Sequence, residues 1–389
     1  MGESSSRSFS FRNPKNYPRD RPSFGGDFRG TLRRGPRARP QPSKGRPPAR
    51  HEKEKRGARK RRLRYLQREL RPPFLASPAL IRRLRDAIRP IYRPRYGEAR
   101  ELPWLRGDDL VLGYAAGGDA FAYPIKVLNF WEIVNDVIAG EPVLVTYCPL
   151  CGSAAVFSRS LGGRVFLFGN TSALYESDMV MLDYETGSYW FQVMGRAIVG
   201  AMTGVELTSL PSATLAWEDW KKLHPATRLL VGDARGGFAG RSRRDPFSGY
   251  AQRLNRGRFA FPVSKDKLDR RLSAGEAVIT TEVGGAIKAY PLRLIGDRAV
   301  NDTLAGRRIA VFSRTSSGAV FLARASGKNL RFAFKDGKFR DEETGSAWNL
   351  AGIATSGPLK GKRLKPLPGR RAFWFSIAGA VPGIGLYMP

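Results

Sequence analysis

The sequence predicts an α+β fold rich in β-structure, in which two tandem, pseudo-symmetric repeats of mostly antiparallel strands with short helices follow a disordered basic tail. Three observations support this prediction. The composition changes near residue 72, a set of short motifs occurs twice along the chain, and short apolar stretches alternate with glycine-rich turns. Of the 389 residues, 42% are hydrophobic, which is enough for a folded core. No apolar run reaches the length of a transmembrane helix.

The first 72 residues are rich in Arg, Pro, Gly and Ser and contain almost no aliphatic side chains, which predicts disorder. Residues 1–100 hold 30 of the 67 Lys and Arg residues but only 8 of the 34 Asp and Glu residues. Most of the net charge of +33 therefore lies in this part of the chain. The tail is either a passive solvated extension or a weak electrostatic contact of residues 1–72 with nucleic acid or another anionic surface. The start shows no signal-peptide pattern, so we expect a cytoplasmic location.

The rest of the chain contains an internal duplication. The second set of motifs follows the first in the same order, at a spacing typical of a duplicated domain rather than of chance matches. The main pairs are Ala122-Tyr123-Pro124 with Ala289-Tyr290-Pro291, Asn135-Asp136 with Asn301-Asp302, Glu185-Thr186-Gly187-Ser188 with Glu343-Thr344-Gly345-Ser346, Leu210-Pro211 with Leu367-Pro368, and Trp217 with Trp374. The expected organisation is a tail at 1–72, a connecting helical segment at 73–100, a first repeat at 101–235, a basic linker at 236–270 and a degenerate second repeat at 271–389.

Each repeat is expected to begin with a strand that leads into its Tyr-Pro pair. A helix from about Ile125 to Ile138 follows in the first repeat, because apolar residues recur there at helical spacing, and Gly140 ends it. Strands are expected next, separated by turns, at residues 142–147, 154–159, 164–169, 179–184 and 188–193.

The motif TYCPLCG, which contains Cys148 and Cys151, carries the most specific chemistry in the sequence. Its proline and glycine allow a loop to curl so that both thiolates face one ion, as in zinc ribbons and rubredoxin, which suggests zinc or iron. The same spacing suits a redox dithiol. It is also compatible with two reduced cysteines that only fill apolar space. All three interpretations remain open at this point.

Ligand number limits the metal interpretation. A structural zinc ion takes four protein ligands, and the chain has two cysteines and two histidines. One histidine, His51, lies in the basic tail, so His224 is the remaining nitrogen ligand. Since His224 precedes Pro225, it is more typical of a helix end than of a metal ligand. The second repeat has Arg314 to Ser317 where the first has the cysteines, so it supplies no thiolate.

Polar and aromatic residues of the first repeat are the candidates for lining a pocket, because paired carboxylates can perform acid–base chemistry. The second repeat keeps the ETGSxW turn but lacks the preceding YESD, which favours a site in the first repeat. The paired Asn-Asp motifs are expected at helix ends, where turn hydrogen bonds are the simpler role. The candidates are Tyr123, Glu132, Asn135, Asp136, Tyr175, Ser177, Asp178, Asp183, Glu185 and Trp190.

These motifs resemble a bacterial and archaeal family catalogued as a domain of unknown function, number three-one-seven-nine. The resemblance runs from AYPIKVLNFWEIVND through VTYCPLCGSAAVFSR and ESDMVMLDYETGSYW to FWF near Phe373, and covers about residues 80–389. It implies no activity, although family members are often exported. Members usually have a histidine at the position of Trp131 and another at that of Ala372. If those histidines bind metal, this chain has lost two ligands.

Three functional hypotheses follow. The first is a duplicated β-rich protein with a partial or vestigial metal site at Cys148 and Cys151. The second is a thiol redox protein or other enzyme with a pocket near these cysteines and Tyr175 to Asp178. The third is a non-catalytic binding protein that uses its basic tail.

Overall fold

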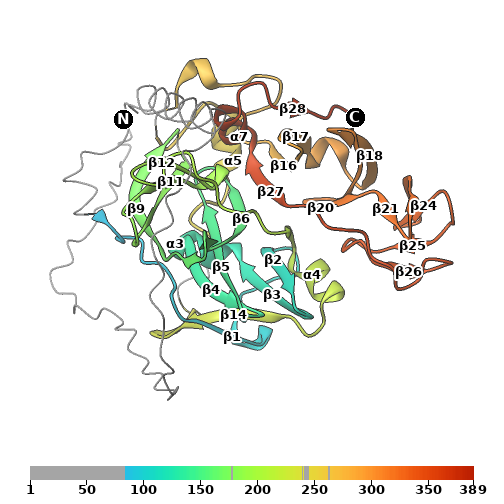
Figure 1. Cartoon of the computed structure of the whole chain (residues 1–389), viewed down its shortest axis with the longest axis horizontal. Coiled ribbons are helices and arrows are strands. Elements are labelled where there is room, and N and C mark those ends of the chain that lie inside the picture. The colour runs from blue at the N-terminus through green and yellow to red at the C-terminus, as the bar shows by residue number, and fades with distance from the viewer. Residues whose placement is uncertain (1–83, 177, 239, 241–244, 262) are drawn as a thin grey trace, which may run out of the picture. The chain divides into compact units, whose positions relative to one another are not determined.

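The computed structural model describes residues 84–176, 178–238, 240, 245–261 and 263–389. The chain divides into Met1–Glu54 and Lys55–Pro389, and every described residue belongs to the second unit. The tail at 1–72, with its expected disorder and anionic partners, and Ser177 lie outside the described residues. The rest is β-rich with short helices, and the predicted fold class is confirmed (Figure 1).

The larger of the two main sheets has nine strands, mostly antiparallel. Its order is β1 (Pro94–Gly97), β14 (Arg228–Asp233), β3 (Asp119–Pro124), β2 (Leu110–Ala116), β13 (Ser212–Ala216), β20 (Ser317–Leu322), β19 (Arg307–Arg314) and β18 (Arg298–Leu304), with β15 (Gly236–Gly237) paired to β14.

The second main sheet has seven strands. Its order is β28 (Gly385–Leu386), β17 (Ala286–Pro291), β16 (Ala277–Val283), β27 (Gly369–Phe373), β6 (Ser153–Ser158), β5 (Glu141–Cys148) and β4 (Ile133–Ile138).

Small sheets and short helices complete the described residues. The small sheets are β12 (Arg196–Val199), β11 (Tyr189–Phe191), β10 (Asp178–Asp183) and β9 (Phe168–Tyr175); β23 (Phe332–Lys335), β24 (Lys338–Asp341), β25 (Ala347–Trp348) and β26 (Ala354–Ser356); β7 (Ser160–Leu161) with β8 (Arg164–Val165); and β21 (Arg324–Ala325) with β22 (Lys328–Asn329). The helices are α3 (Ile125–Trp131), α4 (Trp217–Leu223), α5 (Tyr250–Asn255), α6 (Leu292–Ile295) and α7 (Trp374–Ala380), with 3-10 turns η1 (Ala99–Glu101), η2 (Gln192–Met194) and η3 (Lys265–Lys267). Among the described residues, none of the helices combines the length and apolar character that crossing a bilayer requires.

Each main sheet combines strands from both repeats. In the nine-stranded sheet, β13 of the first repeat pairs with β20 of the second through Thr214 and Gly318. In the seven-stranded sheet, β27 of the second repeat pairs with β6 of the first through Arg371 and Ala154. Strand β13 of the first repeat corresponds to β27 of the second, and β6 corresponds to β20. Each junction therefore pairs the same two strand positions with the repeats exchanged, as expected for pseudo-symmetric repeats.

The predicted helix over Ile125–Ile138 is wrong in its second half. Helix α3 ends at Trp131, and Glu132 follows with a φ of +56°, outside the helical region. Residues Ile133–Ile138 then form β4, which pairs with β5 along its whole length. The segment is rich in β-branched residues, which favour a strand, and this preference prevails over the helical spacing of its apolar residues. The strand expected at 164–169 is also divided, between β8 and the start of β9.

Hydrogen bonds in the two repeats recur at matching positions. The side chain of Asn135 exchanges two hydrogen bonds with the backbone of Phe168, at 2.8 and 2.9 Å. Asn301 does the same with Phe332. Such paired side-chain bonds attach one strand to the next hairpin at the same place in each repeat.

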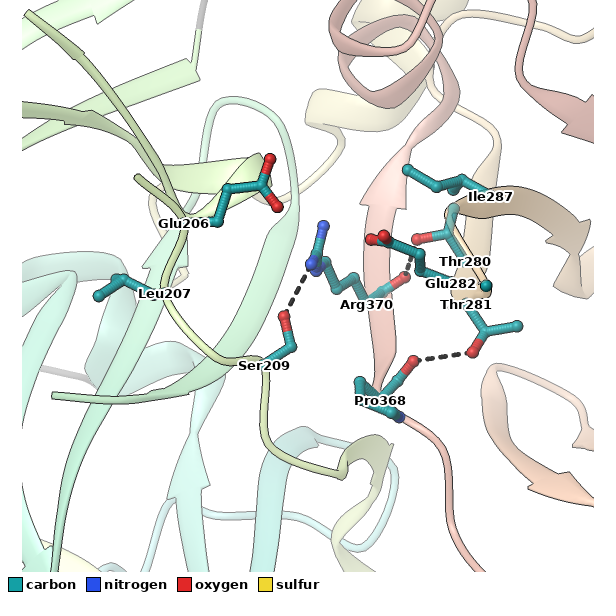
Figure 2. Close-up of a pocket in the computed structure, with 10 residues that line it drawn as sticks. Glu206, Leu207, Ser209, Thr280, Thr281, Glu282, Ile287, Pro368 and Arg370 are labelled. Atoms are coloured by element: carbon teal, nitrogen blue, oxygen red, sulfur yellow. Dashed lines mark hydrogen bonds between the residues drawn. The ribbon is translucent and has the colours of Figure 1, made fainter. Parts of the chain in front are cut away.

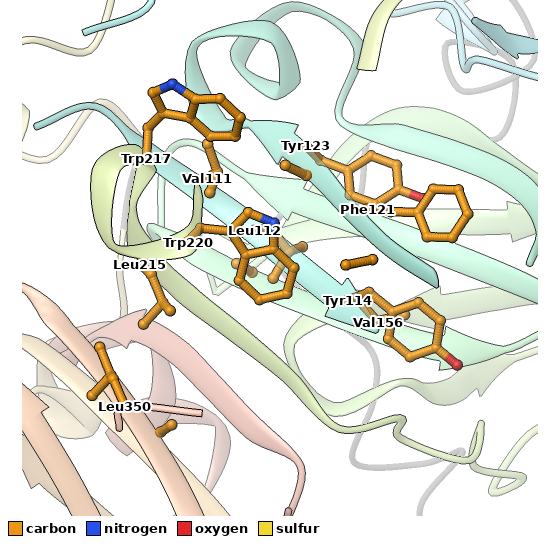
Figure 3. Close-up of a cluster of buried hydrophobic side chains, with 14 of the residues drawn as sticks. Val111, Leu112, Tyr114, Phe121, Tyr123, Val156, Leu215, Trp217, Trp220 and Leu350 are labelled. Atoms are coloured by element: carbon orange, nitrogen blue, oxygen red, sulfur yellow. The ribbon is translucent and has the colours of Figure 1, made fainter. Parts of the chain in front are cut away.

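The largest hydrophobic cluster lies around the nine-stranded sheet and contains residues of both repeats, among them Leu112 and Leu350 (Figure 3). Helix α4 places Trp217 and Trp220 against β2. At Gly113 of β2, an added Cβ would lie 2.2 Å from the Trp220 ring, so only glycine permits this close approach. Burial of large aromatic side chains is a main source of stability for such a core.

Candidate functional site

The CPLCG motif forms the loop between β5 and β6 on the seven-stranded sheet. Cys148 pairs with Ser153 across the hairpin, and the loop between them contains Cys151. Gly152 has a φ of +58°, and an added Cβ would lie 2.8 Å from the Phe373 ring, so this position requires glycine. The backbone N–H of Phe373 also donates to the carbonyl of Cys151, at 2.7 Å. The second repeat therefore fixes the loop of the first.

The corresponding hairpin of the second repeat is shorter. Arg314 pairs with Ser317, so a turn of two residues stands where the first repeat has four. Cys148 is thus matched by Arg314, and Cys151 has no counterpart. The thiols belong to an extension of the first repeat alone.

Cys148 and Cys151 lie next to Asp178, and the ligand atoms of these three residues are all within 4.8 Å of one another. The Sγ of Cys151 lies 2.6 Å from Oδ1 of Asp178 and donates a hydrogen bond to it. None of the three is more than 1% exposed. Among the described residues, this is the one group of three or more Cys, His, Asp or Glu side chains with metal-ligand spacing.

A hairpin extension also brings Asp178 to the cysteines. Strands β9 and β10 pair as far as Tyr175 and Asp178, whereas the equivalent strands of the second repeat are shorter and end at Lys335 and Lys338. The second carboxylate oxygen of Asp178 accepts a hydrogen bond from the backbone N–H of Val193, at 2.7 Å. This bond fixes the carboxylate so that its other oxygen faces the thiol.

Glu132 is a fourth acidic group near enough to interact with the charge of Asp178, although it is not among the three residues with metal-ligand spacing. It is buried, with 8% of its surface exposed, and it has a positive φ of +56° at the end of α3. The amide of Asn170 donates to Oε2 at 2.6 Å. We call Cys148, Cys151, Asp178 and Glu132 the thiol–carboxylate cluster.

Burial dominates the acid–base chemistry of this cluster. Loss of solvation raises the pKa of Cys148, and that of Cys151 well above its ordinary value. It also raises the pKa of Asp178 to about 6 and that of Glu132 to about 8. The negative charges of neighbouring cluster members raise several of these values further. Burial therefore shifts the acid–base equilibrium of each member toward its protonated form.

A chain of neutral polar side chains extends from the cluster. The hydroxyl of Ser153 lies 3.2 Å from the Sγ of Cys151 and 2.5 Å from Oε1 of Gln192. The amide of Gln192 donates to Thr146 at 2.8 Å. We did not predict these residues as site residues, because their types are common in strands. The one available signal was the position of Ser153, two residues after Cys151.

Other predicted pocket residues stabilise turns and strands through hydrogen bonds that do not involve the cysteines. Asp183 accepts from the indole N–H of Trp190 at 2.8 Å and from Thr186, and Asp341 repeats these bonds with Trp348 and Thr344. Glu185 accepts from the backbone N–H of Leu167. The repetition indicates a structural role for the ETGSxW turn.

We expected the two Asn-Asp pairs at helix ends. This prediction is wrong, because the pairs lie within strands β4 and β18. Asp136 accepts from the hydroxyl of Tyr123 at 2.9 Å and also from that of Tyr96. In the second repeat, Asp302 accepts from Tyr290 at 2.9 Å. The strand pairing of β4 and β18 explains the difference, and these side chains hold adjacent strands together.

Of the remaining candidates, Tyr175 is the cross-strand partner of Asp178, and His224 lies on a different element. Tyr175 packs edge-on against Phe191, and its ring lies 5.6 Å from the ammonium of Lys267. His224 follows the last residue of α4 and packs on Trp220, with ring centroids 4.2 Å apart. Burial lowers the pKa of His224, which favours the neutral imidazole.

The two positions where the family resemblance implies histidine lie close to the cluster. Trp131 directly precedes Glu132, and its ring packs on that of Phe238, with centroids 4.2 Å apart. Ala372 is fully buried and packs in a cluster with Val193. Neither side chain can bind a metal.

The family model described as "Protein of unknown function (DUF3179)" matches residues 85–383. The chain belongs to this family. The predicted resemblance, over about residues 80–389, is thereby confirmed. Neither the comparison with curated proteins nor that with solved structures gave a match. The family description assigns no activity, and the thiol–carboxylate cluster is the feature of this chain that indicates a function.

Proposed function

We propose that the chain binds a transition metal ion, zinc or iron(II), in the thiol–carboxylate cluster. Cys148, Cys151 and Asp178 would be its ligands, and Glu132 the fourth acidic group. The observation that carries the proposal is the convergence of three buried ligand atoms within 4.8 Å of one another. Two thiolates with a carboxylate form a ligand set typical of these ions.

The spacing suits a small ion. Zinc lies about 2.3 Å from a thiolate sulfur and about 2.0 Å from a carboxylate oxygen, so ligand atoms in a tetrahedral site are roughly 3–4 Å apart. Cys151 and Asp178 are closer than this, since a proton lies between them. An entering metal ion would replace that proton, and the two atoms would move apart by roughly 1 Å.

The charge balance supports the same proposal. Four acidic groups lie together without a Lys, Arg or His side chain among their described hydrogen-bond or ion-pair partners. Deprotonating several of them without a cation is costly in a buried site. A divalent ion supplies the missing positive charge and holds both thiolates deprotonated.

The environment opposes a redox dithiol, the alternative interpretation. A reactive cysteine needs a lowered pKa and access to its partner. Here burial and neighbouring acids raise the pKa of both thiols, and Cys148 and Cys151 are no more than 1% exposed. A metal site also suits a reducing compartment such as the cytoplasm, where thiols remain free.

The test is metal analysis of the purified full chain. We expect about one equivalent of zinc or iron, or of Co²⁺ after substitution, with thiolate-to-cobalt absorption as evidence of cysteine ligands. Cys148→Ser, Cys151→Ser and Asp178→Asn should each lower the bound metal. Asp341→Asn is the matched control, because Asp341 is a buried carboxylate outside the cluster.

Metal content below about a tenth of an equivalent after refolding with zinc or iron(II) would contradict the proposal. So would metal content that the cysteine variants leave unchanged. Rapid reversible disulfide formation between Cys148 and Cys151 in the full chain would instead support the redox alternative.

A further inference from the structure

A separate polar pocket of about 250 Å³ lies between the two repeats. One wall is the first-repeat segment that contains Glu206 and Ser209, and the other is formed by β16 and β27 of the second repeat. Arg370 of β27 extends from the second wall toward the first (Figure 2). None of the residues of the thiol–carboxylate cluster lines this pocket.

The guanidinium of Arg370 uses only neutral acceptors. Its two terminal nitrogens donate to the carbonyl of Val193, at 3.2 Å, and to the hydroxyl of Ser209, at 2.7 Å. Among the described residues, no carboxylate lies within ion-pair distance of it, although an arginine has five N–H donors. Burial lowers the pKa of Arg370, and the charges of Glu282 and Glu206, neither within ion-pair distance, only partly oppose this shift.

Two carboxylates line the same pocket. Glu206 already forms a salt bridge with Arg196 outside the pocket, with a bond of 2.6 Å from Nε. Glu282 of β16 is exposed and has no ion-pair or hydrogen-bonding side-chain partner within the part of the chain that the structure describes. The pocket therefore presents a cation with spare donors and an anion with spare acceptors.

The first repeat shows that the fold does not need these two charges. Arg370 pairs with Thr280, and the equivalent residues of the first repeat, Ala213 and Gly113, pair in the same register. In that repeat, alanine stands at the position of Arg370, and Ala115 at that of Glu282. The same strand pair is thus built without either charged side chain.

We propose that this pocket binds a small zwitterion of the amino-acid class, with its carboxylate at Arg370 and its ammonium at Glu282. A guanidinium recognises a carboxylate through paired N–H donors, and a free carboxylate recognises an ammonium. The threonine hydroxyls of Thr280 and Thr281 are held by the carbonyls of Arg370 and Pro368, which orders this wall of the pocket. The volume limits the ligand to a small molecule.

The test is calorimetric titration of the full chain with glycine, β-alanine and 4-aminobutyrate as probes. Propionate and ethylammonium each carry only one of the two charges. We expect at least one amino acid to bind about tenfold more tightly than either single-charge compound. If none of the three amino acids binds at about 10 mM, or if a single-charge compound binds as well as the best of them, the proposal is wrong.

Substitutions test the contributions of Arg370 and Glu282 to binding separately. Glu282→Gln should weaken amino-acid binding about tenfold or more and leave propionate binding unchanged or stronger, whereas Arg370→Gln should weaken both. Glu282 is exposed, so its variant tests the proposal even if Arg370→Gln fails to fold. Glu342→Gln, an exposed glutamate that does not line the pocket, is the matched control. Unchanged amino-acid affinity in Glu282→Gln would overturn the proposal.

Discussion

The Sγ of Cys151 lies 2.6 Å from Oδ1 of Asp178, and both side chains are fully buried. The two residues come from different hairpins, and each hairpin is longer than its counterpart in the second repeat. A thiol and a carboxylate in this contact share one proton when no metal is bound. Under the proposed metal binding, the pair would therefore link metal affinity, pH and the stability of this part of the fold.

Asp178→Asn should separate metal binding from folding. The amide keeps the size of the side chain but is a poor metal ligand, so we expect metal affinity to fall at least about 100-fold. The variant should keep its secondary structure, because the amide oxygen can still accept the hydrogen bond from Val193. Competition with a chromophoric chelator measures the affinity, and circular dichroism reports the fold. A wild-type affinity in this variant would exclude Asp178 as a ligand.

Metal affinity should rise steeply with pH. Binding must displace protons from groups whose pKa values burial has raised, to about 6 at Asp178 and about 8 at Glu132, with both thiols also raised. We therefore expect affinity for zinc to increase throughout the range from pH 6 to about 8.5, with release of protons on binding. Calorimetry in buffers of different ionisation enthalpy counts the protons. An affinity independent of pH would contradict this account.

Glu132 should make the metal-free protein less stable as pH rises. Its pKa increases from an ordinary value of 4.5 to about 8 on folding, so the native state binds this proton more tightly than the unfolded state. The contribution to the free energy of unfolding is fully present below pH 4.5 and is lost as pH rises through 8. At about 1.4 kcal/mol per pH unit, the change amounts to a few kcal/mol.

Glu132→Gln removes this titration, so the free energy of unfolding should vary less between pH 5 and 8 than in the wild type. Urea unfolding in the presence of chelator, at several pH values, measures the difference. Glu185→Gln is the control for a carboxylate in the first repeat outside the cluster. The same pH dependence in the Glu132 variant and the wild type would show that another group titrates.

The duplicated turns should contribute to stability and not to metal binding. Asp183→Ala leaves the indole N–H of Trp190 and the hydroxyl of Thr186 without their acceptor, and Asp341→Ala does the same in the second repeat. We expect each substitution to cost about 2–4 kcal/mol of unfolding free energy. Metal stoichiometry should be unchanged in whatever fraction remains folded. Thermal denaturation with parallel metal analysis tests both expectations.

Much of the fold could be predicted from the sequence because its signals are local. The alternating apolar residues predicted most strands of the first repeat, and the recurring motifs predicted the duplication. The helix over Ile125–Ile138 was too long because Val134, Val137 and Ile138 fit both a helical and a strand pattern. The helix ends because the backbone changes direction at Glu132, which allows β4 to pair with β5. Pairing with a later strand is not visible in a local window.

The candidate site could be predicted only in part, for the same reason. Cys148 and Cys151 are close in sequence, and their spacing indicated metal-ligand geometry. Asp178 and Glu132 appeared among the candidates, but so did Asp183 and Asp136, which have structural roles. Nothing in the residue types distinguishes these carboxylates. Only the packing of the long β9–β10 hairpin against the cysteine loop selects Asp178.

The exchange of strands between the two main sheets also has a consequence for synthesis on the ribosome. Strand β6 pairs through Ala154 with Arg371 of β27, which lies more than 200 residues later in the chain. Strand β13 also pairs with a strand of the second repeat, β20. The first repeat therefore emerges with unpaired strand edges on both sheets, which expose it to aggregation until the second repeat follows. Pairings across such distances also slow folding. We therefore expect the nascent chain to need protection for longer than a chain whose repeats each close their own sheet.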